Sequence, residues 1–297
     1  MPFSLTSHII DITHVGVIVD DTPCHALVID GDHHGQAFGV INIHGYFASG
    51  AMYRRESEHL ARSFGWTVAN IDLPGFGSSP PLDQAKLSLA ALADRVEALA
   101  DELGFDRILL IGHSMGASIA IELAQRIPER IVGIIYRAGI ATPSWQHRDG
   151  LITRVLSPIA PEAAPALALL SRATMDVPDL LVGRMVATAR SLVPDLGRNV
   201  RRATRTLPIG SLLLSLDQRD ELRHVVAHGI PLLGEWGCFD YVIPSETADE
   251  FSQLTGVEVQ WVPGGHSWML ARPTGQRDVL AHLSQGQAFM NAIEARV

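Results

Sequence analysis

The chain has 297 residues, of which 47% are hydrophobic, so it is long enough for one large domain with an insertion or for two smaller domains. Its formal net charge of −9 argues against binding to a nucleic-acid backbone as the main task. The two cysteines, Cys24 and Cys238, lie far apart and indicate neither a disulfide framework nor a metal site, and we expect no cofactor.

The cysteine content and the first residues bear on the compartment. Residues 1–6 lack a basic region followed by a long apolar segment, so no signal peptide is visible, and no apolar run reaches membrane-spanning length. We therefore expect a cytoplasmic protein without a membrane span, and the sequence does not indicate its oligomeric state.

Predicted strands and helices alternate through the first half of the chain. Loose alternation in 9–19 and 24–30, around a turn at 20–23, predicts an antiparallel hairpin. Further strands are expected at 38–43, 66–71, 108–111 and 131–136, and helices at 52–64 and 87–103. This alternation predicts a parallel sheet with helices on both faces, in which ligands bind beyond the carboxyl ends of the strands.

The pattern changes after residue 141. From 142 to 223 the sequence is helix-like, has no strong strand and is interrupted by prolines at positions 143, 158, 161, 165, 178, 194 and 208. We interpret 142–223 as an inserted helical cap, and 1–141 with 224–297 as the core domain. The apolar side chains of the cap either line a pocket or pack the cap onto the core, and we favour packing. Four arginines, Arg198, Arg201, Arg202 and Arg205, indicate a solvated helix face rather than an anchor for an anionic substrate.

The alternation resumes after the cap. A strand is expected at 230–236, a helix at 245–254 and a last strand at 257–262, and a C-terminal helix ends the chain.

The segment 112–116, Gly-His-Ser-Met-Gly, lies between the apolar strand at 108–111 and a helical pattern. Such a strand–turn–helix holds a serine in a strained conformation, and the two glycines remove Cβ atoms that would clash in the turn. The helix directs its positive end and free N–H groups at the same place, which suits a nucleophile that passes through an oxyanion. Ser114 is therefore the candidate nucleophile.

Together with four other segments, this one resembles the α/β-hydrolase superfamily, in its serine-nucleophile, esterase- and lipase-like branch. The other segments are His44-Gly45-Tyr46, Asp72-Leu73-Pro74-Gly75-Phe76-Gly77, Gly237-Cys238-Phe239-Asp240 and Gly265-His266, each after a predicted strand. The resemblance covers nearly everything outside the cap. It implies a mostly parallel, eight-stranded sheet flanked by helices, with a cap after the sixth strand, and the chain order nucleophile, acid, histidine.

A serine hydroxyl needs a base that takes its proton, and imidazole has a suitable pKa. We select His266, which follows the last strand. A carboxylate must orient that imidazole, and Asp240 is our choice. Asp72 is the alternative acid, although we expect it to hold its own loop, and Asp149 and Asp217 fit less well.

Two other histidines lie near the serine or the loop after the third strand. We expect the side chain of His113 to point away from the hydroxyl of Ser114 and to pack against neighbouring loops, and His44 to brace the loop that follows it. The resemblance implies two backbone N–H donors for the oxyanion, those of Tyr46 and Met115.

The leading hypothesis is a serine hydrolase that cleaves a small-molecule ester through an acyl-enzyme. A serine nucleophile departs from the epoxide-hydrolase and dehalogenase branches. Two alternatives stay open: hydrolysis of a carbon–carbon bond in a β-diketone-like substrate, and a non-catalytic binding protein that kept the fold.

Overall fold

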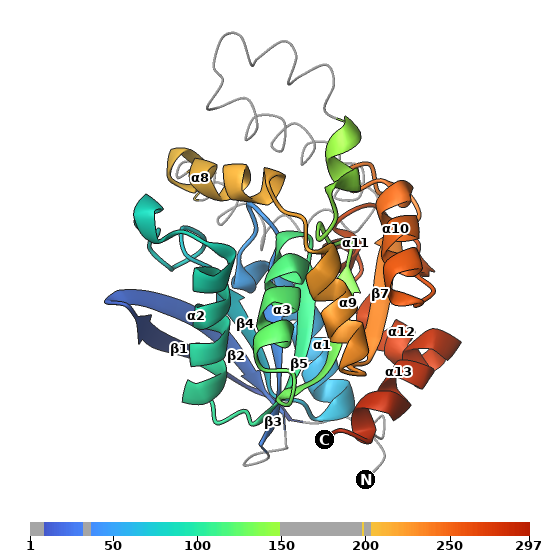
Figure 1. Ribbon diagram of the computed structural model, residues 1–297. Coiled ribbons are helices and arrows are strands. Elements are labelled where there is room, and N and C mark those ends of the chain that lie inside the picture. The colour runs from blue at the N-terminus through green and yellow to red at the C-terminus, as the bar shows by residue number, and fades with distance from the viewer. Residues whose placement is uncertain (1–8, 32–36, 149–197, 199–202) are drawn as a thin grey trace.

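A single twisted sheet organises the chain (Figure 1). The computed structural model describes residues 9–31, 37–148, 198 and 203–297. Its strands are β1 (Asp11–Val19), β2 (Thr22–Asp30), β3 (Phe38–Ile43), β4 (Val68–Asp72), β5 (Arg107–His113), β6 (Ile131–Arg137), β7 (Leu232–Gly237) and β8 (Gln260–Val262).

The eight strands lie in the order β1-β2-β4-β3-β5-β6-β7-β8. β2 runs antiparallel to both of its neighbours, and the remaining neighbours pair in parallel. The mostly parallel sheet predicted from the sequence is confirmed. From β3 the chain continues outward to β4 and then returns to β5 on the other side of β3. Ligand sites form beside such reversals, at the carboxyl ends of the strands.

Helices cover both faces of this sheet. One face carries α2 (Leu89–Glu102), α3 (Met115–Arg126), α9 (Arg219–Ala227) and α10 (Ser245–Thr255), and the other carries α1 (Arg54–Phe64), α11 (Trp268–Ala271), α12 (Gly275–His282) and α13 (Ser284–Glu294). β5 supplies Ile108 and Leu110 to the first apolar cluster and Leu109 and Ile111 to the second. Because successive strand residues face opposite sides, one apolar run serves both clusters.

The C-terminal helix expected from the sequence is α13, but two further helices, α11 and α12, precede it. They are separate because Pro273 cannot continue α11 and Leu283 adopts an extended conformation between α12 and α13. Pro208 lies inside α8 (Ala203–Leu214), although we expected it to interrupt the helix. The helix loses one N–H donor at this proline and continues to Leu214.

The predicted cap lies mostly outside the described residues, so its boundaries stay a prediction. α8 crosses above the carboxyl ends of the central strands (Figure 1). The expected end of the cap, residue 223, lies inside α9, which packs against α3 and α10. Short 3-10 helices, η1 (Gly50–Tyr53), η2 (Gln84–Lys86) and η3 (Pro143–Arg148), complete the described elements. Within these ranges, every helix is too short or too polar to cross a membrane.

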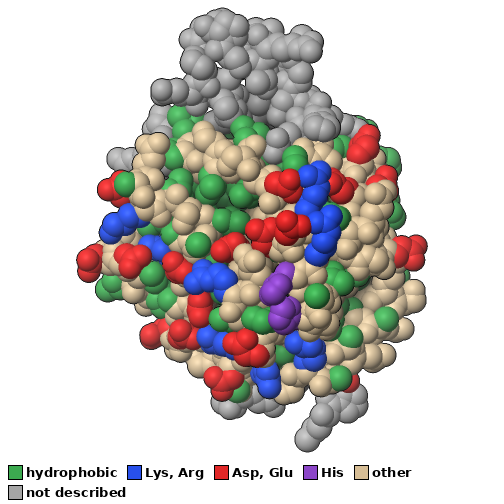
Figure 2. All heavy atoms as spheres, in the orientation of Figure 1, with side chains coloured by type: hydrophobic (Ala, Val, Ile, Leu, Met, Phe, Trp, Pro, Cys, Tyr) green, Lys and Arg blue, Asp and Glu red, His purple; other side chains and the backbone are tan. Residues whose placement is uncertain are grey.

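Opposite charges lie next to each other on the face shown in Figure 2. Ion pairs of this kind join α2 to α3, as between Arg126 and Asp94 at 2.6 Å. Exposed pairs contribute only about 0–1 kcal/mol each, so the apolar cluster beneath accounts for most of the packing of these helices.

A buried ion cluster lies under the carboxyl ends of β6 and β7. The guanidinium of Arg137 contacts Glu56 at 2.8 Å and Glu235 at 3.1 Å, and all three side chains are essentially inaccessible. Gln276 donates to the other oxygen of Glu235 at 2.9 Å. Burial raises the pKa of Glu235 to about 7, although Arg137 favours its charged form. Charge in this cluster therefore depends on pH near neutrality.

We expect Glu235 to lower the stability of the protein as pH rises. The folded protein binds its proton with a pKa of about 7, against the ordinary value of 4.5, so protonation stabilises the fold below pH 4.5 and this contribution is lost up to pH 7. The free energy of unfolding of the wild type, relative to Glu235→Gln, should fall by up to about 3 kcal/mol over this range.

Urea unfolding at several pH values measures this difference. Glutamine has only one of the two oxygens with which Glu235 accepts hydrogen bonds from Arg137 and Gln276. This loss changes the free energy of unfolding by the same amount at every pH, so the pH dependence of the difference is unchanged. Exposed Glu129, changed to Gln, is the matched control for the substitution itself. A flat difference for Glu235→Gln would show that Glu235 titrates alike in the folded and unfolded chain.

Candidate active site

Ser114 forms the turn between β5 and α3. Its backbone has φ 54° and ψ −114°, which is unusual for a residue with a side chain and costs about 1–3 kcal/mol. Hydrogen bonds on both sides hold the turn: Ser114 N–H donates to the carbonyl of Arg137 at 2.9 Å, and Ala117 N–H donates to the carbonyl of Ser114 at 3.1 Å. The serine is 9% exposed at the rim of the sheet.

Gly112 and Gly116 give this turn its room. A Cβ atom on Gly112 would lie 2.6 Å from Cα of Ala117, and one on Gly116 would lie 2.1 Å from the carbonyl oxygen of Ile43. Real Cβ atoms do not approach so closely. Gly112 lets the end of β5 pass close to the first turn of α3, and Gly116 lets α3 pack against the end of β3.

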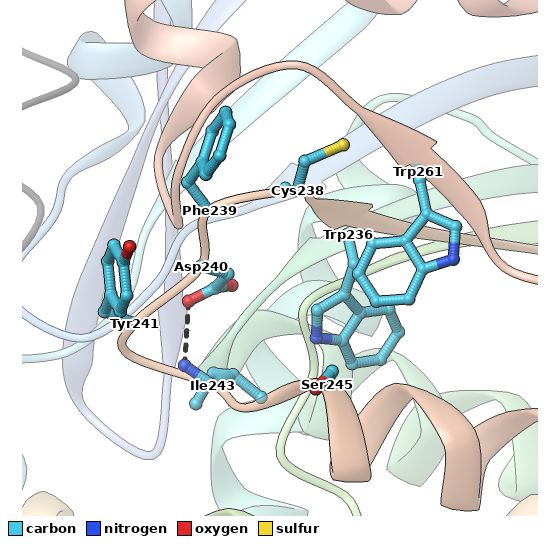
Figure 3. Close-up of a pocket in the computed structure, with 9 residues that line it drawn as sticks. Trp236, Cys238, Phe239, Asp240, Tyr241, Ile243, Ser245 and Trp261 are labelled. Carbon is cyan, nitrogen blue, oxygen red and sulfur yellow. Dashed lines mark hydrogen bonds between the residues drawn. The ribbon is translucent and has the colours of Figure 1, made fainter.

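Asp240 and His266 come together from the loops after β7 and β8. Nδ1 of His266 lies 2.9 Å from Oδ2 of Asp240. The other carboxylate oxygen accepts the N–H groups of Val242 and Ile243, both at 2.8 Å, and Figure 3 shows the bond to Ile243. With Nδ1–H donating to the carboxylate, the lone pair of the neutral imidazole is on Nε2. The Asp240 side chain is 2% exposed and that of His266 is 9% exposed, so the pair is shielded from water.

The other candidate acids have different partners. The two oxygens of Asp72 accept the N–H groups of Gly50 and Ser78, each at 2.8 Å, which agrees with a role in holding its own loop. Asp217 pairs with Arg219 at 2.7 Å on the surface. Asp149 lies outside the described residues.

The loop after β3 lies directly beside the serine. A Cβ atom on Gly45 would be 3.3 Å from Cβ of Ser114. His44 braces this loop by accepting the N–H of Leu73 on Nε2 at 3.0 Å, as expected. Among the described residues, the N–H groups of Tyr46 and Met115 have no acceptor. Both expected oxyanion donors therefore belong to segments that meet around Ser114.

The side chain of Tyr46 reaches toward the cap segment. Its hydroxyl donates to the carbonyl of Thr206 in α8 at 2.8 Å, and burial raises its pKa to about 12. This bond ties α8 to the loop beside the serine. Of the four arginines in the predicted basic cluster, Arg198 donates to the carbonyl of Gly77 at 3.3 Å, while Arg201 and Arg202 lie outside the described residues.

His113 packs against the neighbouring loops, as expected, but its partners were not foreseen. Its Nδ1 lies 2.6 Å from the hydroxyl of Tyr53, and its Nε2 lies 3.0 Å from the carbonyl of His266. Sequence reasoning overlooked Tyr53 and Arg137 altogether. For Arg137, the charge at the end of an apolar strand was a usable signal, whereas nothing around Tyr53 distinguishes it from a core residue.

A cavity of about 180 Å³ lies beside the loop after β7 that carries the candidate acid Asp240 (the acid loop). Nine residues line it, including Trp236, Phe239, Tyr241 and Trp261 (Figure 3). Phe239 and Tyr241 are 64% and 57% exposed. The loop that carries Asp240 therefore exposes aromatic surface. In the described part of the chain, no group of three or more His, Cys, Asp or Glu side chains is placed to hold a metal ion.

The family model for the alpha/beta hydrolase fold matches residues 40–267. The chain is 26% identical over 256 residues to "Putative non-heme haloperoxidase" of Mycobacterium phage D29, covering 83% of this chain and 87% of that protein. It is 33% identical over 126 residues to the pimeloyl-[acyl-carrier protein] methyl ester esterase of Aeromonas hydrophila, covering 41% and 46%. A structure from a study of Nitrososphaera gargenis carboxylesterases superposes with TM-score 0.68 at 16% identity, covering 95% and 100%. Because the family model spans more than half of the sequence, the chain belongs to the α/β-hydrolase fold family.

Proposed function

We propose that this protein is a serine hydrolase that cleaves a small-molecule ester through an acyl-enzyme, with Ser114 as nucleophile, His266 as base and Asp240 as acid. One observation carries the proposal: the strained serine turn and the hydrogen-bonded Asp240–His266 pair lie at the same rim. His113 connects them, since it precedes Ser114 and lies 3.0 Å from the carbonyl of His266. In such an arrangement an imidazole takes the proton of a hydroxyl that is otherwise a poor nucleophile, and the carboxylate stabilises the imidazolium that forms.

In the proposed reaction, the Ser114 oxygen attacks the ester carbonyl while Nε2 of His266 takes its proton. Asp240 stabilises the imidazolium, which then protonates the leaving alcohol. The N–H groups of Tyr46 and Met115 bind the oxyanion, and the loss of one such donor typically costs about 3 kcal/mol in the barrier. Water, activated by the same imidazole, then attacks the acyl-enzyme and releases the acid.

The names of the relatives favour an ester over other carbonyl substrates. The Aeromonas relative is named as a methyl ester esterase and the Nitrososphaera study concerns carboxylesterases. We infer that this chain acts on the same class of bond, while the β-diketone alternative becomes an outcome of the assay. We also propose that residues 142–223 form a cap over the substrate site, and that α8 is part of this cap. We propose a cytoplasmic location as well.

Ser114→Ala should abolish labelling by a fluorophosphonate probe and lower kcat on an activated short-chain ester by about 10⁴-fold or more, because no other hydroxyl occupies the turn. Mass spectrometry of the labelled peptide and initial rates measure both. Ser118 lies in α3, one turn after Ser114, and its hydroxyl is unpaired within the described structure; Ser118→Ala is the control and should behave like wild type. A wild-type protein that reacts with neither probe nor ester would favour a binding role. If the protein cleaved a vinylogous diketone faster than the ester, the assignment of the substrate class would be overturned, while Ser114 would remain the proposed nucleophile.

Asp240→Asn should lower kcat by about 10³- to 10⁴-fold while the thermal unfolding temperature stays close to wild type, because asparagine cannot hold the reactive tautomer of His266. Asp72→Asn should leave kcat close to wild type and lower the thermal unfolding temperature. It leaves an N–H of Gly50 or Ser78 without its acceptor, which costs about 1–3 kcal/mol of stability. Rates and melting curves of the two variants separate the two acids, and a large loss of kcat in Asp72→Asn alone would reverse the assignment.

Tyr46→Phe keeps the backbone N–H and removes the hydroxyl that binds α8. We expect amide hydrogen exchange in α8 (Ala203–Leu214) to rise about fivefold, since the bond contributes about 1 kcal/mol. Tyr241→Phe removes a hydroxyl from a ring that is 57% exposed and should leave α8 unchanged. Equal exchange in both variants would mean that the Tyr46 hydroxyl does not anchor the helix.

A further inference from the structure

A chain of hydrogen bonds runs beneath the serine turn. Gly45 N–H donates to the hydroxyl of Tyr53 at 3.4 Å, and this hydroxyl lies 2.6 Å from Nδ1 of His113. Nε2 of His113 lies 3.0 Å from the carbonyl of His266. The chain thus joins the loop that contains Tyr46, the residue before Ser114, and the loop that contains the candidate base.

The carbonyl of His266 settles which nitrogen of His113 carries the proton. A carbonyl can only accept, so Nε2 must be protonated, and Nδ1 of a neutral ring must then accept from the Tyr53 hydroxyl. His113 is 3% exposed and Tyr53 is 1% exposed, so water does not compete for these groups. Burial holds the pKa of His113 well below its ordinary value, which keeps the ring neutral.

Neutrality of His113 matters to its neighbour. The rings of His113 and His266 lie with their centroids 4.6 Å apart. A proton on His266 during the reaction would be opposed by a second cation at this distance, whereas a neutral ring leaves it to the carboxylate of Asp240. The hydroxyl of Tyr53 donates its proton to Nδ1 of His113 and so favours the neutral ring that is protonated on Nε2.

We propose that His113 is a positioning residue, which holds the His266 loop over Ser114 through the His266 carbonyl, with Tyr53 selecting the tautomer that can do so. This rests on the proposed function of Ser114 and His266. The alternative is that His113 only fills space under the turn. The two differ in what a substitution does: a positioning residue needs a donor at the place of Nε2, and a space-filling residue needs only volume.

Glutamine, asparagine and methionine separate these roles. The amide nitrogen of Gln reaches the place of Nε2, whereas that of Asn reaches only the place of Nδ1, and Met has about the volume of Gln without a donor. In His113→Asn and His113→Met we expect fluorophosphonate labelling and kcat to fall about 10- to 100-fold, because a small displacement of the base is costly, with KM nearly unchanged. In His113→Gln both should stay within about threefold of wild type.

Hydrogen exchange gives a second readout that does not need a reactive serine. Amides in 264–268 should exchange at least about fivefold faster in His113→Asn than in His113→Gln, since the loop has lost its bond to residue 113. Tyr53→Phe keeps His113 and removes only the donor to Nδ1, so it replaces His113→Asn if that variant does not fold. It should also loosen the loop and slow labelling.

Each outcome decides the matter. Slow labelling and a loosened loop in both His113→Asn and His113→Met, with rescue in His113→Gln, support the proposal. Labelling and exchange in His113→Met that equal those in His113→Gln overturn it, because volume alone is then sufficient. If wild-type Ser114 is not labelled, the proposed function fails, and loop exchange alone then shows whether His113 holds the loop. A loop that exchanges alike in wild type, Tyr53→Phe and all three His113 variants overturns the positioning role as well.

Discussion

The site depends on one close contact, between the start of α3 and the end of β3. A Cβ atom on Gly116 would lie 2.1 Å from the carbonyl oxygen of Ile43, so only glycine permits this approach. The approach traps Ser114 at φ 54°, a conformation that would otherwise relax and release about 1–3 kcal/mol. It also brings the loop with Gly45 against Cβ of the serine. The conformation of the Ser114 turn is therefore fixed by close contacts between backbone atoms, and it does not depend on side-chain rotamers.

Buried polar groups extend this constraint away from the rim. The carbonyl of Arg137 receives the N–H of Ser114, while its guanidinium binds Glu56 from α1 and Glu235 from β7. One residue thus connects the serine turn to the neighbouring strand and to the helix layer on the far face. Removal of one partner from such a buried group leaves an uncompensated charge and typically costs about 3–5 kcal/mol. The cluster therefore restricts how β6 and β7 can shift, and with them the acid loop that follows β7.

Much of the fold follows from local pattern, because an apolar run such as that of β5 can only be buried and its length suits a strand. The Ser114 turn follows from two glycines at fixed offsets. The partners of His113 do not: Tyr53 and His266 lie 60 and 153 residues away, and periodicity reports burial without naming a neighbour. Pro208 misled for the converse reason: its local effect is to end a helix, yet inside α8 it removes one N–H without ending the helix.

Asp72 and Asp240 show where sequence context stops distinguishing two roles. Both aspartates follow a strand, both lie at the same rim, and both accept backbone N–H groups that fix the carboxylate in rotation. Asp72 uses both oxygens for this purpose. Asp240 receives two N–H groups on one oxygen, and its second oxygen meets His266 at 2.9 Å. The difference arises from the loop after β8, which brings an imidazole to one carboxylate and not to the other. Whether an aspartate meets an imidazole or only braces a turn is thus decided by a segment remote in sequence, and the proposed hold of His113 on that segment acts on Asp240 as well as on His266.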